Sequence, residues 1–116
     1  MAFKFENLRV WELAIDLSAE VSKLVKTFPA EERFVLSTQM QRAADSVALN
    51  IAEGSTGQSN AEFKKFLGYA NRSAIEVVSC LHLGRKRNVI TEDGFTRLYA
   101  SFEGLIIKIQ ALKNSF

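Results

Sequence analysis

The chain contains one cysteine, one proline and six glycines in 116 residues. The single cysteine, Cys80, excludes an intramolecular disulfide and with it the framework of a small secreted protein. Scarce proline and glycine permit long, uninterrupted helices. No apolar run approaches the ~18 residues that a membrane span needs, and the N-terminus has no long apolar core. The cytoplasm is therefore the expected compartment.

A strong excess of one charge is also missing. Fifteen Lys and Arg face 13 Asp and Glu, which leaves a formal net charge of +2. A charge this small does not point to nucleic acid by itself, so any basic signal must come from clustering. Hydrophobic residues make up 47% and charged residues 24%, as is ordinary for a globular protein. The length fits a single domain spanning residues 1–116.

Apolar residues recur at steps of three and four in four segments, which is typical of amphipathic helices. These segments are about residues 7–28, 30–53, 60–87 and 92–113. Connections of a few residues force neighbouring helices to run antiparallel. The sequence therefore predicts an all-α fold, an antiparallel up-down-up-down four-helix bundle.

Local signals place the ends of these helices. Asn7, Ser59 and Thr91 are each suited to cap a helix N-terminus. Pro29 fits the first turn of the second helix, and Gly54 fits a left-handed position just past its end.

Two features predict contact between subunits. The apolar stripe of the first helix is wider than one neighbouring helix requires. The second helix carries small residues, including Ala43 and Ala44, that allow another backbone to approach closely. Both observations favour extra apolar surface that is covered by other copies of the chain.

A polar stripe runs along the second helix in the segment RAADSVALNIAEG. Its members are Arg42, Ser46, Asn50 and Glu53. Steps of four, four and three residues put these side chains on one side of the helix. An antiparallel hairpin with its turn near residue 57 brings Arg42 within a turn of Glu76, whose carboxylate would balance the permanent guanidinium charge.

We favour an internal network that fixes helix register as the role of this stripe, with Arg42, Ser46, Asn50, Glu53 and Glu76 as its members. A ligand or protein-contact site built from the same residues is the alternative. Catalysis fits least, because Arg42 and Glu53 are ~16 Å apart along the helix axis and do not converge on one pocket.

Other chemical signals are few. His82 and Cys80 are two residues apart on a helix and point to different sides, and neither has partners at metal-ligand spacing. The GSTG stretch lacks the lysine and the preceding strand of a phosphate-binding loop. We expect no metal and no cofactor.

Basic residues gather on the third helix. One group, on one flank of the helix, is Lys64, Lys65 and Arg72. The other group, at the helix end, is Arg85, Lys86 and Arg87. Each group is most simply a solvated face or a complement to the helix dipole. The alternative is a phosphate-binding surface, which gains weight if several copies of the chain are brought together.

Three segments carry a resemblance to a known family: FENLRVWELA, RAADSVALNIAEG and EFKKFLGYANRSAIE. They resemble the four-helix-bundle proteins called 23S rRNA intervening-sequence proteins. The match covers nearly the whole chain, and its most specific part is NIAEG. The matching positions include Phe5, Leu8, Val10, Trp11, Phe28, Pro29, Leu36, Gln39, Arg42, Ala43, Ser46, Asn50, Ile51, Ala52, Glu53, Gly54, Phe63, Phe66, Leu67, Ala70, Ser73 and Glu76.

Members of this family are similar to the accessory proteins of diversity-generating retroelements, which form pentameric barrels and bind RNA and a reverse transcriptase. The resemblance implies a ring-shaped homopentamer without enzyme activity. Two function classes follow. One is an oligomeric RNA-binding accessory protein, and the other is a scaffold that binds a protein partner.

Overall fold

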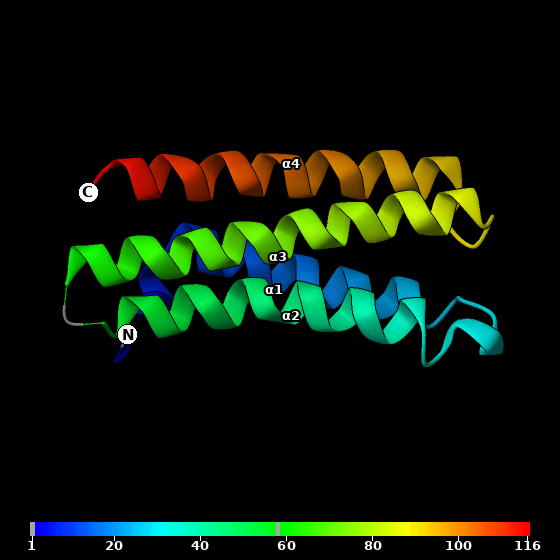
Figure 1. Cartoon of the computed structure of the whole chain (residues 1–116), viewed down its shortest axis with the longest axis horizontal. Helices are drawn as coiled ribbons and strands as arrows, with labels where there is room; N and C mark the ends of the chain where they lie inside the picture. Colours follow the sequence, from blue (N-terminus) through cyan, green and yellow to red (C-terminus); the bar gives the residue numbers. More distant parts are fainter. Residues whose placement is uncertain (1, 58) are drawn as a thin grey trace.

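The computed structural model describes residues 2–57 and 59–116. Four long helices form the fold: α1 (Arg9–Val25), α2 (Leu36–Ser55), α3 (Asn60–Lys86) and α4 (Glu92–Asn114). Two short 3-10 helices, η1 (Lys4–Asn7) and η2 (Ala30–Glu32), precede α1 and α2. Each long helix runs opposite to the one before it, so the predicted four-helix bundle is confirmed (Figure 1).

The four helices enclose one elongated core in a molecule of 43 × 22 × 21 Å. α2 packs against α1 and α3, whereas α4 packs mainly against α3 and less extensively against α1. α2 and α4 are therefore diagonal to each other (Figure 1). This arrangement leaves their outer faces on opposite sides of the bundle.

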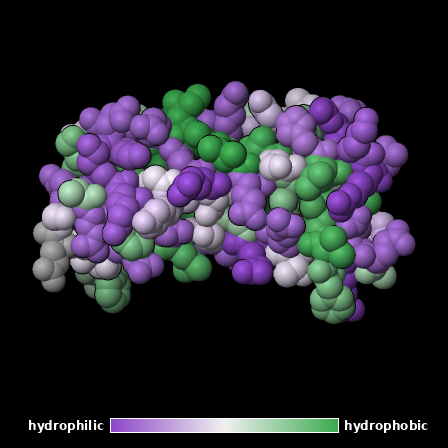
Figure 2. Space-filling model, viewed as in Figure 1, coloured by the Kyte–Doolittle hydropathy of each residue, from purple (hydrophilic) through white to green (hydrophobic). Residues whose placement is uncertain are grey.

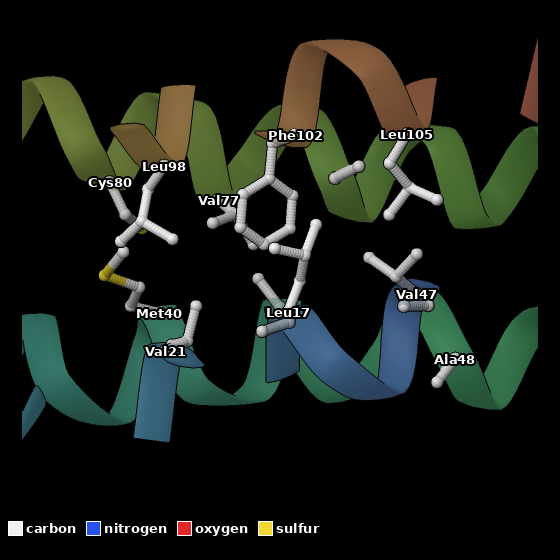
Figure 3. Close-up of a cluster of buried hydrophobic side chains, with 14 of the residues drawn as sticks. Leu17, Val21, Met40, Val47, Ala48, Val77, Cys80, Leu98, Phe102 and Leu105 are labelled. Atoms are coloured by element: carbon white, nitrogen blue, oxygen red, sulfur yellow. The ribbon is translucent and has the colours of Figure 1, made fainter. Parts of the chain in front are cut away.

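The core is filled by the predicted apolar stripes. Figure 3 shows the ring of Phe102 at the centre of a cluster, pointing from α4 toward Leu17 of α1. Met40, Val77 and Leu98 bring α2, α3 and α4 to the same cluster, and all three are at most 1% exposed. Burial of side chains from all four helices accounts for most of the stabilisation of such a bundle.

The first two helices are shorter than the sequence predicts. Asn7 does not cap α1, because the N-cap position is Leu8 and has no side-chain hydrogen bond. α1 ends at Val25 rather than near residue 28, and the N–H groups of Thr27 and Phe28 instead make turn hydrogen bonds to the backbone oxygens of Leu24 and Val25.

The predicted start of the second helix at residue 30 is wrong. Pro29 precedes the short helix η2, and α2 begins only at Leu36. Phe34 and Val35 have low intrinsic helix propensity, and Val35 takes a non-helical φ of −119° at the N-cap. The segment from Pro29 to Val35 is therefore a turn that projects at one end of the bundle.

Gly54 is not the left-handed residue that the sequence predicts. It lies inside α2, and no glycine in the described part of the chain has a positive φ. A Cβ at Gly54 would lie 2.5 Å from Cβ of Phe66 and 3.1 Å from Cδ1 of Phe63. Glycine is required here because α2 and α3 approach each other closely, not because the backbone turns.

The predicted caps of α3 and α4 are confirmed. The Ser59 hydroxyl accepts a hydrogen bond from the backbone N–H of Glu62 at 3.1 Å, and that of Thr91 accepts one from Gly94 at 3.0 Å. α3 ends at Lys86, and Asn88 then adopts a φ of 62°, a left-handed conformation that asparagine tolerates. This residue turns the chain toward α4.

Candidate functional site

The polar stripe of α2 is in part a hydrogen-bonded network. The side-chain amide of Asn50 donates to the backbone oxygen of Ser46 at 2.8 Å and to its hydroxyl at 2.9 Å. The Ser73 hydroxyl donates to the same Ser46 hydroxyl at 2.9 Å and so links α3 to α2. All three side chains are half-buried. Ser46 and Asn50 belong to the predicted network, whereas Ser73, which makes the contact between the helices, was not among its predicted members.

The charged members do not take part as expected. Arg42, Glu53 and Glu76 are all exposed, and no ion pair joins Arg42 to Glu76 in the part of the chain that the structure describes. The expectation of a buried pair is therefore wrong for the single chain. The sequence spacing correctly predicts that Arg42 and Glu76 lie at the same height along the bundle. Both side chains nevertheless point outward into solvent.

Arg42 and Glu76 instead line an open groove between the outer faces of α2 and α3. The groove residues are Phe34, Val35, Thr38, Gln39, Arg42, Ala43, Asp45, Ser46, Leu49, Ser73 and Glu76. Three of these are large apolar residues in water, with Phe34 84%, Val35 54% and Leu49 66% exposed. Figure 2 shows the hydrophobic surface at the end of the bundle where α2 begins. Exposed apolar side chains that are bordered by polar residues are typical of a protein-contact surface.

The small residues of α2 add little to this surface, although Ala43 lines the groove. Ala43 and Ala44 are 4% and 1% exposed and pack inside the bundle, so the expectation that they receive another subunit is wrong. Ile15 of α1, by contrast, is 42% exposed, which agrees with an apolar stripe wider than the bundle covers. α4 also exposes an apolar residue, Ile107, at 63%.

The basic residues of α3 fall into two groups. Lys65 and Arg72 are exposed and Lys64 is half-buried, and none of these three is ion-paired within the described residues. At the helix end the situation differs. Two of the cations have carboxylate partners, Arg85 with Glu92 at 3.7 Å and Arg87 with Glu32 at 3.1 Å. Lys86 has no ion pair with any residue that the structure describes.

Arg85 and Arg87 therefore have structural contacts in addition to any role in binding. The guanidinium carbon of Arg85 lies 3.7 Å from the centroid of the Phe95 ring. Arg87 joins the end of α3 to η2 through Glu32, whose side chain is only 13% exposed. Nearer the start of α3, Lys64, Lys65 and Arg72 have no carboxylate partner among the described residues.

The lone cysteine and histidine have no arrangement for catalysis. Cys80 is buried, and burial raises the pKa of its thiol, with a further increase from the Glu76 carboxylate. The thiolate is the reactive form, so this cysteine is a poor nucleophile. His82 packs edge-on against Phe95 and Tyr99. In the described residues, no three potential ligands from His, Cys, Asp and Glu come together as a metal site.

The model of the 23S rRNA-intervening sequence proteins matches residues 6–111. The chain belongs to this family. It is also similar in structure to a crystallised protein of unknown function from the S23 ribosomal protein family of Bacteroides thetaiotaomicron, with a TM-score of 0.84 and 24% sequence identity. That match covers 90% of this chain and 95% of the other, and at this identity it shows the fold alone. No curated protein matches the chain.

Two side chains near the site, Asp45 and Tyr69, were not predicted from the sequence. Asp45 accepts hydrogen bonds from Ser18 at 2.5 Å and from Gln41 at 2.9 Å, which links α2 to α1. Tyr69 is 39% exposed on the outer face of α3, between Lys65 and Arg72. The spacing of four and three residues from Lys65 to Tyr69 to Arg72 is the sequence pattern that indicates a shared helix face.

No helix of the described residues is both long enough and apolar enough to cross a lipid bilayer.

Proposed function

We propose that the protein is a non-enzymatic, ring-forming homopentamer that binds RNA in the cytoplasm. The observation that carries self-association is the exposed groove of α2 and α3, where Phe34, Val35 and Leu49 lie in water. Leaving such side chains exposed is costly, and a second copy of the chain would bury them.

The partner surface that we assign to the groove is the outer face of α4. Ile107 is 63% exposed there, and Ala100 and Ala111 share that side of the helix and are exposed too. Because small residues flank Ile107, a neighbouring subunit can approach the helix closely. α2 and α4 are diagonal in the bundle, so the groove and the outer face of α4 are different surfaces of the molecule. An interface between different surfaces is heterologous and generates a closed ring when its rotation closes.

The assembly is tested first by its mass. Light scattering coupled to size exclusion should give five times the 13.0 kDa of the chain. Leu49→Glu and Ile107→Glu should each break the ring, because a charge placed in an apolar interface must be desolvated. Ile75→Glu removes an apolar residue that is 56% exposed on α3, outside both surfaces, and should leave the mass unchanged.

Mixing the two disrupted variants distinguishes the heterologous interface from other modes. The Leu49→Glu chain keeps an intact α4 face, and the Ile107→Glu chain keeps an intact groove, so the mixture should form a complex of two chains. A wild-type protein that elutes as a monomer would refute the ring. Two disrupted variants that remain monomeric on mixing would refute the pairing of these surfaces.

RNA binding is supported by the unpaired cations of α3 and by their repetition in a ring. A single chain has a net charge of only +2, but an assembly presents each basic group several times on one particle. Weak contacts made together give a much higher apparent affinity than one contact alone. We therefore expect micromolar, sequence-tolerant RNA binding at low salt.

A filter-binding titration at several salt concentrations tests this expectation. Each phosphate contact with single-stranded RNA contributes about 0.7 to the slope of log K against log salt. Lys65→Gln combined with Arg72→Gln should therefore flatten the slope by more than 1 if both residues bind phosphate. Lys23→Gln with Lys26→Gln removes the same charge at the C-terminal end of α1 and is the matched control. If the wild type retains no RNA near ~50 mM salt, the RNA function is wrong and the protein-binding scaffold takes its place.

A further inference from the structure

The outer face of α3 carries an aromatic ring between two free cations. Lys65, Tyr69 and Arg72 are spaced by four and three residues, so their side chains lie on one face of the helix. Lys65 and Arg72 are ~10 Å apart along the helix axis, which leaves room for a flat group over the ring between them. Neither cation has a carboxylate within ion-pair distance among the described residues, and the ammonium of Lys65 lies 5.6 Å from the centroid of the Phe66 ring.

The ring of Tyr69 is held in place by the neighbouring ring of Phe66. It meets the ring of Phe66 edge-on, with centroids 5.4 Å apart and an interplanar angle of 80°. Phe66 in turn packs against Gly54 of α2, where there is no room for a side chain. Because Phe66 is fixed by this close approach, Tyr69 is supported on one edge while 39% of the residue remains exposed. A ring held in this way loses little conformational freedom when it binds a ligand.

The second tyrosine has a similar exposure but different surroundings. Tyr99 is 36% exposed and packs with Phe95 and His82. The cation beside this cluster, Arg85, stacks on Phe95 and lies 3.7 Å from Glu92. Arg85 is therefore paired with a carboxylate, unlike Lys65 and Arg72 on either side of Tyr69.

We propose that Lys65, Tyr69 and Arg72 form a binding site for single-stranded RNA. An unpaired base stacks on the exposed ring of Tyr69, and the two cations hold the phosphates on either side. Stacking tolerates any sequence, because every base has a π face. A duplex offers no free base face to the ring and is held only by its phosphates. The inference rests on the proposed RNA binding and adds which form of RNA is bound and which residue selects it.

Fluorescence anisotropy with a labelled oligouridylate of about 12 nucleotides, compared with an RNA duplex of similar length, tests the site. Tyr69→Leu should weaken binding of the single strand about tenfold and leave duplex binding within about twofold, because only the stacked base is lost. Tyr69→Phe keeps an aromatic face and should bind the single strand like the wild type. Tyr99→Leu is the matched control and should change neither affinity.

The outcomes separate this site from the proposed function. If Tyr69→Leu binds the single strand as tightly as the wild type, or if the wild type binds duplex and single strand equally, the Tyr69 site is refuted. Salt-dependent binding that still requires Lys65 and Arg72 would then leave the proposed function standing. Absence of binding to both RNA forms by the wild type would overturn both. Circular dichroism melts of each variant show whether a loss of binding reflects the site or the fold.

Discussion

Replacing Phe102 by alanine should lower the free energy of unfolding by about 3–5 kcal/mol, the range for removing a large aromatic side chain from a packed core. Phe102 is 1% exposed and lies at the centre of the cluster between α1, α3 and α4 (Figure 3). α4 packs less extensively against α1 than against α3, and the ring of Phe102 fills the space toward Leu17. A cavity there would loosen the attachment of α4 to the rest of the bundle.

Urea denaturation followed by circular dichroism measures the change. Phe102→Leu should lose less stability than Phe102→Ala, because the remaining side chain fills part of the cavity. Glu103→Ala changes the neighbouring exposed residue and should stay within about 0.5 kcal/mol of the wild type. A Phe102→Ala protein as stable as the Glu103→Ala control would show that this ring is not central to the core.

The periodic features of the fold could be predicted from the sequence. Steps of three and four residues identified the buried stripes of α2 and α4, including Met40, Val47, Leu98 and Phe102. The caps at Ser59 and Thr91 were also predictable, because a short hydroxyl side chain just before a helix commonly accepts a hydrogen bond from a free backbone N–H of the first turn. Helix caps and periodic apolar stripes depend on nearby residues of the same segment, so they can be predicted without knowing how the helices pack.

What could not be predicted depends on contacts between helices. Arg42 and Glu76 do line the same groove, as their levels in the hairpin suggested, but helix rotation turns both toward solvent. The spacing of residues along the sequence predicts how far along the bundle two side chains lie, but it does not predict how each helix is rotated about its axis. The turn before Leu36 was missed because Pro29 fits the first turn of a long helix equally well, whereas here it precedes only the short helix η2. Tyr69 was missed although its spacing of four and three residues from Lys65 and Arg72 places it on the same face of α3 as these cations.

Gly54→Ala should destabilise the bundle, whereas the same change at Gly68 in the next helix should not. Cβ of Phe66 is fixed to its own backbone, so a methyl group 2.5 Å away from it at Gly54 must push α2 and α3 apart. Overpacking of this kind costs up to about 3 kcal/mol. The higher helix propensity of alanine offsets about 1 kcal/mol of that cost. The expected net loss is about 2 kcal/mol.

At Gly68 the added methyl group would meet only the ammonium end of Lys113, at 3.3 Å, and that end is free to move. Gly68→Ala should therefore gain up to about 1 kcal/mol from helix propensity alone. The two identical substitutions should differ by about 3 kcal/mol in the free energy of unfolding, measured by denaturant titration. Equal stabilities would mean that the α2–α3 crossing can open without cost and that glycine is not required there. A large difference would explain why the NIAEG segment ends in glycine, since no other residue lets α3 come so close to α2 at this position.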